Sequence, residues 1–211
     1  MYLTFYIKKG TNHFLLGGWD EFDILPKNQS IIKVKTPDKE LDWLEVQKVT
    51  FDERTIGENL TATLDFGSTI SSFPSSMLAE IKQFFEDIDL GCELYFTSSE
   101  LFLQLGCSLK SREDMPDLRF HISGYVFILD HTKMIDVCSP KNPLSNKMNC
   151  LINLEFQSGG TQIVFGKTFL QYLSFGFFFD DLEIWMSMDN MISQQEFDLQ
   201  MEEKMKKKEG G

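Results

Sequence analysis

The sequence has little positive charge. Its 20 lysines and arginines are outnumbered by 32 aspartates and glutamates, and the formal net charge at pH 7 is -12. Proteins that bind nucleic acids need clustered basic side chains to displace the counterions of the phosphates, so this balance argues against a nucleic-acid partner. The one basic cluster, residues 204–208, stands among glutamates at the C-terminal end and is interpreted as a solvated helix end.

Long apolar runs are also missing. A membrane-spanning helix needs roughly 18 or more consecutive apolar residues. The closest stretch, residues 169–179, is too short and contains Gln171 and Ser174, so no membrane span is expected. The N-terminal residues alternate like a strand and show no basic segment ahead of an apolar one, which argues against a signal peptide in this chain.

Motifs for metals, cofactors and serine nucleophiles are absent from the sequence. His13, His121 and His131 are scattered, and neither an HExxH motif nor paired CxxC segments accompany them. No glycine-rich phosphate loop and no Gly-x-Ser-x-Gly nucleophile turn occurs. We therefore predict no metal site and no cofactor. His121 shares one face of an alternating run with Arg119 and is interpreted as a surface strand residue.

What the sequence does contain favours β-structure. There are 20 phenylalanines against three tryptophans and five tyrosines, and aromatic side chains suit half-buried, pleated surfaces. Alternating apolar residues predict strands at residues 2–7, 31–34, 44–51, 61–64, 118–122 and 125–129. Ser123 and Gly124 supply a hairpin turn between the last two strands.

Helical signals are fewer. Residues 75–85 place apolar side chains at helical spacing behind Pro74, with a serine as the cap, and residues 191–208 form a second, mostly polar candidate. We predict an all-β-dominated fold with one or two short helices and a helical C-terminal tail. No internal repeat or proline-rich linker divides the chain, so one domain is expected over residues 1–189, followed by a polar helical or disordered tail over residues 190–211.

The stretch TLDFGST, residues 63–69, has two possible interpretations. Asp65, Phe66 and Gly67 spell the metal-binding triplet of protein kinases, but the glycine-rich loop, strand lysine and catalytic loop that a kinase needs upstream are absent. An aspartate on a glycine turn after a strand also describes half of an aspartic protease site. Ser68 stands where its hydroxyl can hydrogen-bond the carboxylate and hold it ionised and oriented.

Five segments in the same order agree with the second interpretation. Residues 1 to about 189 resemble the C-terminal lobe of a pepsin-like aspartic protease, a β-rich lobe of the double-psi type. The segments that carry the resemblance are FYIKKGTNHFLLGGWDEFDI, LDWLEVQKVTF, TLDFGSTISSFP, MPDLRFHISGYVFIL and QIVFGKTFLQYLSFGFFFDDLEIWM. The resemblance rests on the order of these segments over nearly the whole chain.

The resemblance implies an aspartic-type endopeptidase, which hydrolyses peptide bonds with two facing carboxylates and an activated water. It assigns Asp65 as the catalytic carboxylate, Gly67 and Ser68 as the residues that shape its turn, and Gly166 as part of the psi-loop that crosses beneath. The chain holds one such aspartate, so the other would come from an N-terminal protease lobe or from a second copy of this chain. The substrate would be a peptide or a protein.

Two residues depart from the family's pattern. Phe66 stands where the family places threonine or serine, whose hydroxyl ties the two active-site loops together. Lys167 stands where many members carry aspartate. The alternative function is therefore a catalytically inactive, pseudoenzyme lobe that acts as a binding or assembly module.

The four cysteines form two local pairs by spacing, Cys92 with Cys107 and Cys138 with Cys150. Four cysteines allow three connectivities, and the sequence alone does not choose among them. The resemblance favours a disulfide in the segment that holds Cys92 and Cys107. Two short-loop disulfides would imply a secretory, lysosome-like or extracellular location. The glycosylation sequons that begin at residues 28 and 59 agree with that location.

Overall fold

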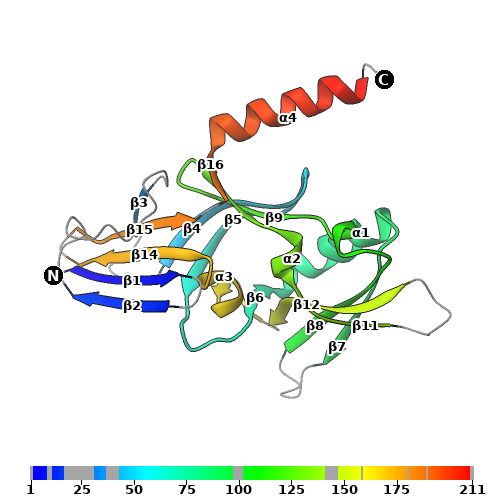
Figure 1. Ribbon diagram of the computed structural model, residues 1–211, viewed down its shortest axis with the longest axis horizontal. Helices are drawn as coiled ribbons and strands as arrows, with labels where there is room; N and C mark the ends of the chain where they lie inside the picture. The colour runs from blue at the N-terminus through cyan, green and yellow to red at the C-terminus, as the bar shows by residue number, and fades with distance from the viewer. Residues whose placement is uncertain are drawn as a thin grey trace.

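The computed structural model describes residues 2–8, 11–16, 31–36, 43–96, 102–140, 147–157, 159–179, 181–188 and 190–209. These residues form two β-sheets with short helices between and beside them and a longer helix at the C-terminal end (Figure 1). Strands dominate the structure, which confirms the predicted fold class. The sequon at Asn28 and residues 17–24 of the first family-like segment lie outside the described residues.

The five-stranded sheet brings together strands from the two ends of the chain. Its order is β2-β1-β14-β15-β3, and every pairing in it is antiparallel. The strands are β1 (Tyr2–Lys8), β2 (Thr11–Leu16), β3 (Ile32–Lys35), β14 (Leu173–Phe178) and β15 (Glu183–Met188). All six residues of β14 are buried, as expected for a strand that is covered on both faces. The strands predicted at residues 2–7 and 31–34 are confirmed here.

The 11-stranded sheet contains most of the remaining chain. Its order is β16-β10-β9-β4-β5-β13-β6-β12-β8-β7, with β11 paired to β12 beside this path. The strands are β4 (Trp43–Phe51), β5 (Arg54–Leu64), β6 (Ser71–Pro74), β7 (Gly91–Phe96), β8 (Phe102–Leu109), β9 (Leu118–Ile122), β10 (Tyr125–Leu129), β11 (Ile135–Pro140), β12 (Met148–Gln157), β13 (Ile163–Phe165) and β16 (Met191–Ser193).

Two parallel pairings interrupt the antiparallel pattern of this sheet. β13 runs parallel to β5, and β12 runs parallel to β6. Parallel neighbours end in the same direction, so the segments that follow β5 and β13 leave the sheet at the same edge. This arrangement brings together two parts of the chain that lie about 100 residues apart in sequence.

The helices are short except for the last. They are α1 (Leu78–Asp87), α2 (His131–Met134), α3 (Lys167–Leu170) and α4 (Gln194–Glu209), with 3-10 turns η2 (Ser75–Met77) and η3 (Arg112–Asp114). The helix predicted over residues 75–85 corresponds to η2 and α1, and the one over residues 191–208 to α4. No helix in the described part of the chain is both long and apolar enough to cross a membrane.

The predicted serine cap is wrong. The chain enters η2 directly from β6, so the extended residue before the first turn is Pro74, which has no side-chain acceptor. Met77 precedes α1, and neither helix start has a side-chain cap hydrogen bond. Packing, and not a cap, stabilises α1, because the helix buries Ile81, Phe84 and Phe85 on one face.

The predicted hairpin of β9 and β10 is confirmed. Its central residues, Ser123 and Gly124, have φ values of 49° and 78°. Positive φ at both central residues gives the turn whose twist matches that of two paired strands. Gly124 adopts this conformation without a steric cost.

Phenylalanine side chains fill the core. The fully buried ones are Phe51, Phe73, Phe85, Phe120, Phe127, Phe156, Phe165, Phe169 and Phe175, and each contributes about 1.5–3 kcal/mol by leaving water. The rings of Phe165 and Phe169 stack with centroids 4.2 Å apart, and Phe120 packs edge-on against both at 5.0 Å. Phe165 and Phe169 lie on either side of Gly166 in the sequence, so their packing in the core fixes that segment.

His121 is not the surface residue that the sequence predicts. Its exposed fraction is 6%, equal to that of Arg119. The C-terminal segment covers His121, because β16 pairs with β10, the neighbour of β9, and α4 follows directly from β16 (Figure 1). Phe197 of α4 packs edge-on against the His121 ring at 5.4 Å, and Gln194 Oε1 lies 2.7 Å from His121 Nδ1. The division of the chain at residue 189 stays a prediction.

Both predicted cysteine pairs are disulfides. Cys92 and Cys107 join β7 to β8, and Cys138 and Cys150 join β11 to β12. The connectivity that the sequence leaves open is therefore the local one. No free cysteine remains among the described residues.

Candidate active site

Asp65 lies at the point where β5 ends in a tight turn. Leu64, the last residue of the strand, is buried, whereas Asp65 is exposed. The backbone amide of Asp65 donates a 3.0 Å hydrogen bond to the carbonyl of Phe165, which ends the parallel strand β13. The sheet therefore fixes the backbone from which the carboxylate projects.

Two donors of the same turn hold the Asp65 carboxylate. The Ser68 hydroxyl donates to Oδ2 at 2.7 Å, and the Gly67 amide donates to Oδ1 at 2.8 Å. The bond from Ser68, followed by that from Gly67, holds the pKa of Asp65 below its usual value against the opposing effect of burial. A Cβ atom at Gly67 would lie 3.2 Å from Oδ1, so the turn closes most easily around glycine. The carboxylate is thus ionised at neutral pH and oriented.

Gly166 lies against the Asp65 turn at the start of α3. A Cβ atom on Gly166 would lie 2.5 Å from the carbonyl oxygen of Ile70, so a side chain does not fit there. The next amide, that of Lys167, donates a 2.8 Å hydrogen bond to the carbonyl of Ser68. The structure therefore brings Gly67, Ser68 and Gly166 to Asp65, although Gly166 is remote in sequence.

A second set of hydrogen bonds, which the sequence does not reveal, joins the start of β6 to the segment at Gly166 and α3. Ser71 Oγ accepts a 3.1 Å hydrogen bond from the buried amide of Gly166. The Ser71 amide in turn donates to Thr168 Oγ1 at 2.9 Å, and the two hydroxyl oxygens lie 3.0 Å apart. The only sequence signal is that hydroxyl residues occur in both segments, which is too common to assign a pairing.

Phe66 follows Asp65 in the sequence and packs on the five-stranded sheet. Its ring stacks on that of Phe175 with centroids 5.0 Å apart and meets Phe177 edge-on at 6.4 Å. Both partners belong to β14 of the five-stranded sheet. Phe66 nevertheless stays 47% exposed. The residue next to the ionised Asp65 is therefore an apolar ring that packs on β14 with one part and is open to solvent with the rest.

The site as described holds a single carboxylate, that of Asp65. The groups that shift the pKa of Asp65 are Ser68, Gly67 and burial, and no second carboxylate of the described residues is among them. One ionised carboxylate can orient a water molecule and accept its proton. It lacks a protonated partner to polarise a carbonyl, because one carboxyl group does not hold both protonation states at once.

A second cluster, formed by Asp117, Asp130 and His131, is the one group of described residues whose side chains come close enough to share a metal ion. Internal hydrogen bonds already occupy it. Asp117 Oδ1 accepts from the His131 amide at 3.0 Å and lies 3.1 Å from His131 Nδ1. Asp130 Oδ1 accepts from the Thr132 amide at 2.9 Å, as an N-cap of α2. These contacts give the cluster a structural explanation at the start of α2, and the absence of a metal site stays a prediction.

The Asp65 turn, together with the segment at Gly166 that packs against it, is the arrangement of one lobe of the pepsin-like class. The sequence matches the model of the eukaryotic aspartyl protease family over residues 1–198. The chain therefore belongs to the eukaryotic aspartyl protease family. No curated protein matches the chain.

Proposed function

We propose that this chain is the C-terminal lobe of an aspartic endopeptidase and that Asp65 supplies one carboxylate of the dyad. The observation that carries the proposal is the Asp65 turn itself. Its carboxylate is exposed and receives hydrogen bonds from Gly67 and Ser68. The turn packs closely against Gly166, where a side chain does not fit. A residue kept only for packing does not need an oriented, solvent-facing charge.

The lowered pKa of Asp65 keeps its carboxylate ionised in weak acid, which is the protonation state that a general base needs. In the proposed reaction Asp65 takes a proton from a water molecule, whose oxygen attacks the carbonyl carbon of the scissile peptide bond. The second carboxyl group, from an N-terminal lobe or a second copy of this chain, is protonated and donates a hydrogen bond to the carbonyl oxygen. Transfer of a proton to the leaving nitrogen then completes the hydrolysis.

The substrate of this site would be a peptide or protein, and the setting an oxidising one. Both disulfides favour the secretory pathway, a lysosome-like organelle or the cell exterior, where such bonds persist. The sequon at Asn59 agrees with that setting, because Asn59 is exposed on β5.

Activity of the natively purified protein tests the proposal. The tagged chain is isolated from its source with its bound partners and incubated at acidic pH with internally quenched peptides. The Asp65→Asn variant should lose at least about 100-fold in activity, since it removes the general base. Glu58→Gln is the matched control, because Glu58 is an exposed carboxylate on β5, the strand that leads into the Asp65 turn. Equal activity of the Asp65→Asn variant and the wild type would overturn the proposal.

A second candidate function is a non-catalytic binding or assembly module, and Phe66 favours it. A phenyl ring makes no hydroxyl hydrogen bond to a facing loop, but it offers an exposed apolar contact at the same place. For such a module the purified protein is inactive, and Asp65→Asn leaves its set of bound partners unchanged. The assay above separates the two functions because only the enzyme depends on the charge of Asp65.

A further inference from the structure

All four cysteines lie in one row across four neighbouring strands. The strand register places Cys92 of β7 opposite Cys107 of β8, Cys107 opposite Cys150 of β12, and Cys150 opposite Cys138 of β11. Residues directly opposite one another in antiparallel strands project to the same face of a sheet. The four side chains therefore form a continuous row on one face.

The row has a buried middle and more accessible ends. Cys107 and Cys150 are 2% and 1% exposed, whereas Cys92 and Cys138 are partly exposed. Each disulfide joins one outer residue to one inner residue. The two inner cysteines thus belong to different disulfides and yet face each other directly across β8 and β12.

We propose that this row is a thiol–disulfide exchange site, at which a dithiol reductant converts the two outer disulfides into one central disulfide between Cys107 and Cys150. Opposed residues of antiparallel strands have Cβ atoms about 4.5–5.5 Å apart. A disulfide joins Cβ atoms about 3.5–4.5 Å apart. The central bond therefore needs only a small approach of two strands that are already paired.

The exchange begins at an accessible end of the row. A thiolate of the reductant attacks Sγ of Cys92, the bond to Cys107 breaks, and Cys107 leaves as a thiolate. The second thiol of the reductant attacks the mixed disulfide, which releases Cys92 as a thiol and the reductant as a cyclic disulfide. The Cys107 thiolate then attacks Sγ of Cys150, and Cys138 leaves and takes up a proton. The dithiol is oxidised by two electrons, and the protein gains two thiols.

Attack at the other end gives the same product. A reductant that opens the Cys138–Cys150 bond at the accessible Cys138 expels Cys150 as the thiolate, and Cys150 then attacks Cys107. Both routes leave Cys107 joined to Cys150 and the two outer cysteines reduced. The geometry favours this outcome because the expelled thiolate is in each case the inner one, which faces the other inner sulfur.

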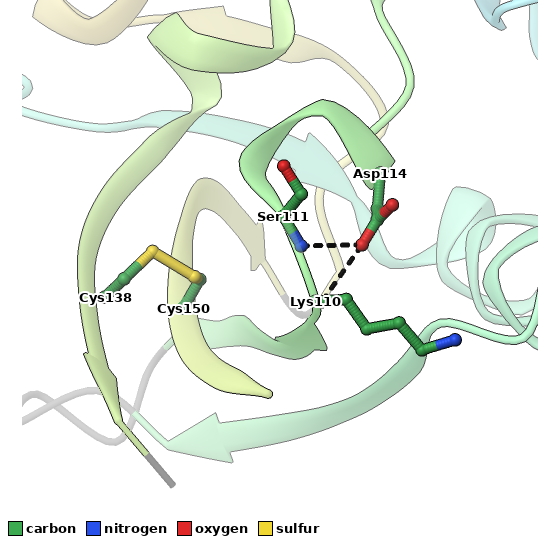
Figure 2. The surroundings of a disulfide bond; sticks show 5 residues. All are labelled: Lys110, Ser111, Asp114, Cys138 and Cys150. Carbon is green, nitrogen blue, oxygen red and sulfur yellow. Dashed lines mark hydrogen bonds between the residues drawn. A yellow bond between two sulfur atoms is a disulfide. The ribbon is translucent and has the colours of Figure 1, made fainter. Parts of the chain in front are cut away.

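The end of β8 is held by contacts that do not involve a disulfide. Figure 2 shows the turn after β8 beside the Cys138–Cys150 bond. In this turn Asp114 Oδ2 accepts hydrogen bonds from the amides of Lys110 at 2.9 Å and Ser111 at 2.8 Å. The backbone pairing of β8 with β12 does not depend on either disulfide, so the two strands stay side by side when an outer bond opens and the inner cysteines remain opposed.

The exchange changes which strands are covalently tied. With two outer disulfides, β7 and β11 are fastened to their neighbours, whereas the central disulfide fastens only β8 to β12. β7 ends the sheet, and within the described residues β11 pairs only with β12. The reduced form thus keeps a covalent bond in the middle of this sheet and leaves the two outer strands held by backbone pairing alone.

Partial reduction of the full chain tests the proposal. The folded protein is treated with limiting dithiothreitol, quenched with acid, alkylated with N-ethylmaleimide and mapped by peptide mass spectrometry. We expect the species with two thiols to carry both labels on Cys92 and Cys138, and its one remaining disulfide to join Cys107 to Cys150. Labels on Cys92 together with Cys107, or on Cys138 together with Cys150, would overturn the proposal.

Two matched double variants give an independent test. Cys92→Ser with Cys138→Ser keeps the inner pair, and we expect the folded protein to contain no free thiol. Cys107→Ser with Cys150→Ser keeps the outer pair, which is separated by three strand spacings, or about 14 Å. That distance exceeds the reach of a disulfide, so two free thiols are expected. Two free thiols in the folded first variant would contradict the exchange.

Discussion

The Cα of Gly166 lies so close to the carbonyl of Ile70 that a Cβ atom on the glycine would be 2.5 Å from the carbonyl oxygen and 2.8 Å from its carbon. The carbonyl oxygen of Ser68 would lie 2.9 Å away. All three are backbone atoms, which do not rotate out of the way as a flexible side chain does. The geometry of the Asp65 turn therefore depends on the missing side chain of a residue about 100 positions later.

Replacement of Gly166 should destabilise the fold. We expect Gly166→Ala to lower the free energy of unfolding by about 1–3 kcal/mol, the usual cost of overpacking. Urea unfolding monitored by tryptophan fluorescence measures the change. Gly91→Ala is the control, because the nearest atom to its Cβ is the Ser108 Cβ at an ordinary 3.8 Å. Equal losses of unfolding free energy in the two variants would show that the contact between Gly166 and the Ile70 carbonyl is not tight.

The Asp65 carboxylate should titrate differently without its serine. Because the Ser68 hydroxyl is the largest cause of the lowered pKa, Ser68→Ala should raise the pKa of Asp65 toward its usual value. Carbon-13 NMR of the aspartate carboxyl carbons measures it. An unchanged pKa in the variant would mean that the Gly67 amide alone holds the charge.

The same shift gives a sign for the pH dependence. The folded state holds the pKa of Asp65 below that of the unfolded chain, so the stabilisation is complete above the unfolded value near 3.8. It is lost as the pH falls through the lower folded value. Ser68→Ala should therefore weaken the loss of stability below about pH 4. The effect is small because Asp65 is exposed to screening by solvent.

Local patterns in the sequence predict much of this fold. The alternation over residues 44–51 and 118–129 corresponds to β4, β9 and β10, and the Ser123-Gly124 turn joins the last two as expected. The Asp65 turn is also local, since both hydrogen bonds to its carboxylate come from within three residues. A period or a turn motif suffices wherever the interacting residues are neighbours in sequence.

Contacts between remote residues escape such patterns. Ser71 and Thr168 are 97 residues apart, and the pairing of β13 with both β5 and β6 brings them together. His121 alternates like a surface residue, and it becomes buried because residues 73 positions later fold back over it. The row of cysteines likewise depends on the register of four strands, which spacing alone does not give.

His121 should make the packing of α4 against β9 sensitive to acid. Burial lowers the pKa of His121, the charges of Lys48 and Arg119 add to the effect, and Gln194 and Asp198 oppose it. The unfolded chain therefore binds the proton more tightly than the folded one. Stability is complete above the unfolded value of 6.5 and declines as the pH falls from there toward the lower folded value.

Removal of this titration should flatten the decline. His121→Gln keeps a polar side chain beside Gln194 but takes up no proton, so its thermal midpoint should fall less between about pH 7 and pH 5 than that of the wild type. Differential scanning fluorimetry across this range measures the midpoint, and amide hydrogen exchange in α4 locates the opening. Parallel curves for the variant and the wild type would contradict the prediction.

The last prediction concerns Phe66, whose ring and missing hydroxyl have opposite consequences. Phe66→Thr removes two ring contacts on β14 and should cost about 1–2 kcal/mol of stability. It also restores a hydroxyl where the family has one. In the natively purified complex, peptide cleavage should therefore rise in Phe66→Thr and not in Phe66→Leu, which restores no hydroxyl. If the two variants cleave peptides equally, or if both lose their bound partners, Phe66 acts as an apolar docking contact and the binding module becomes the better description of this lobe.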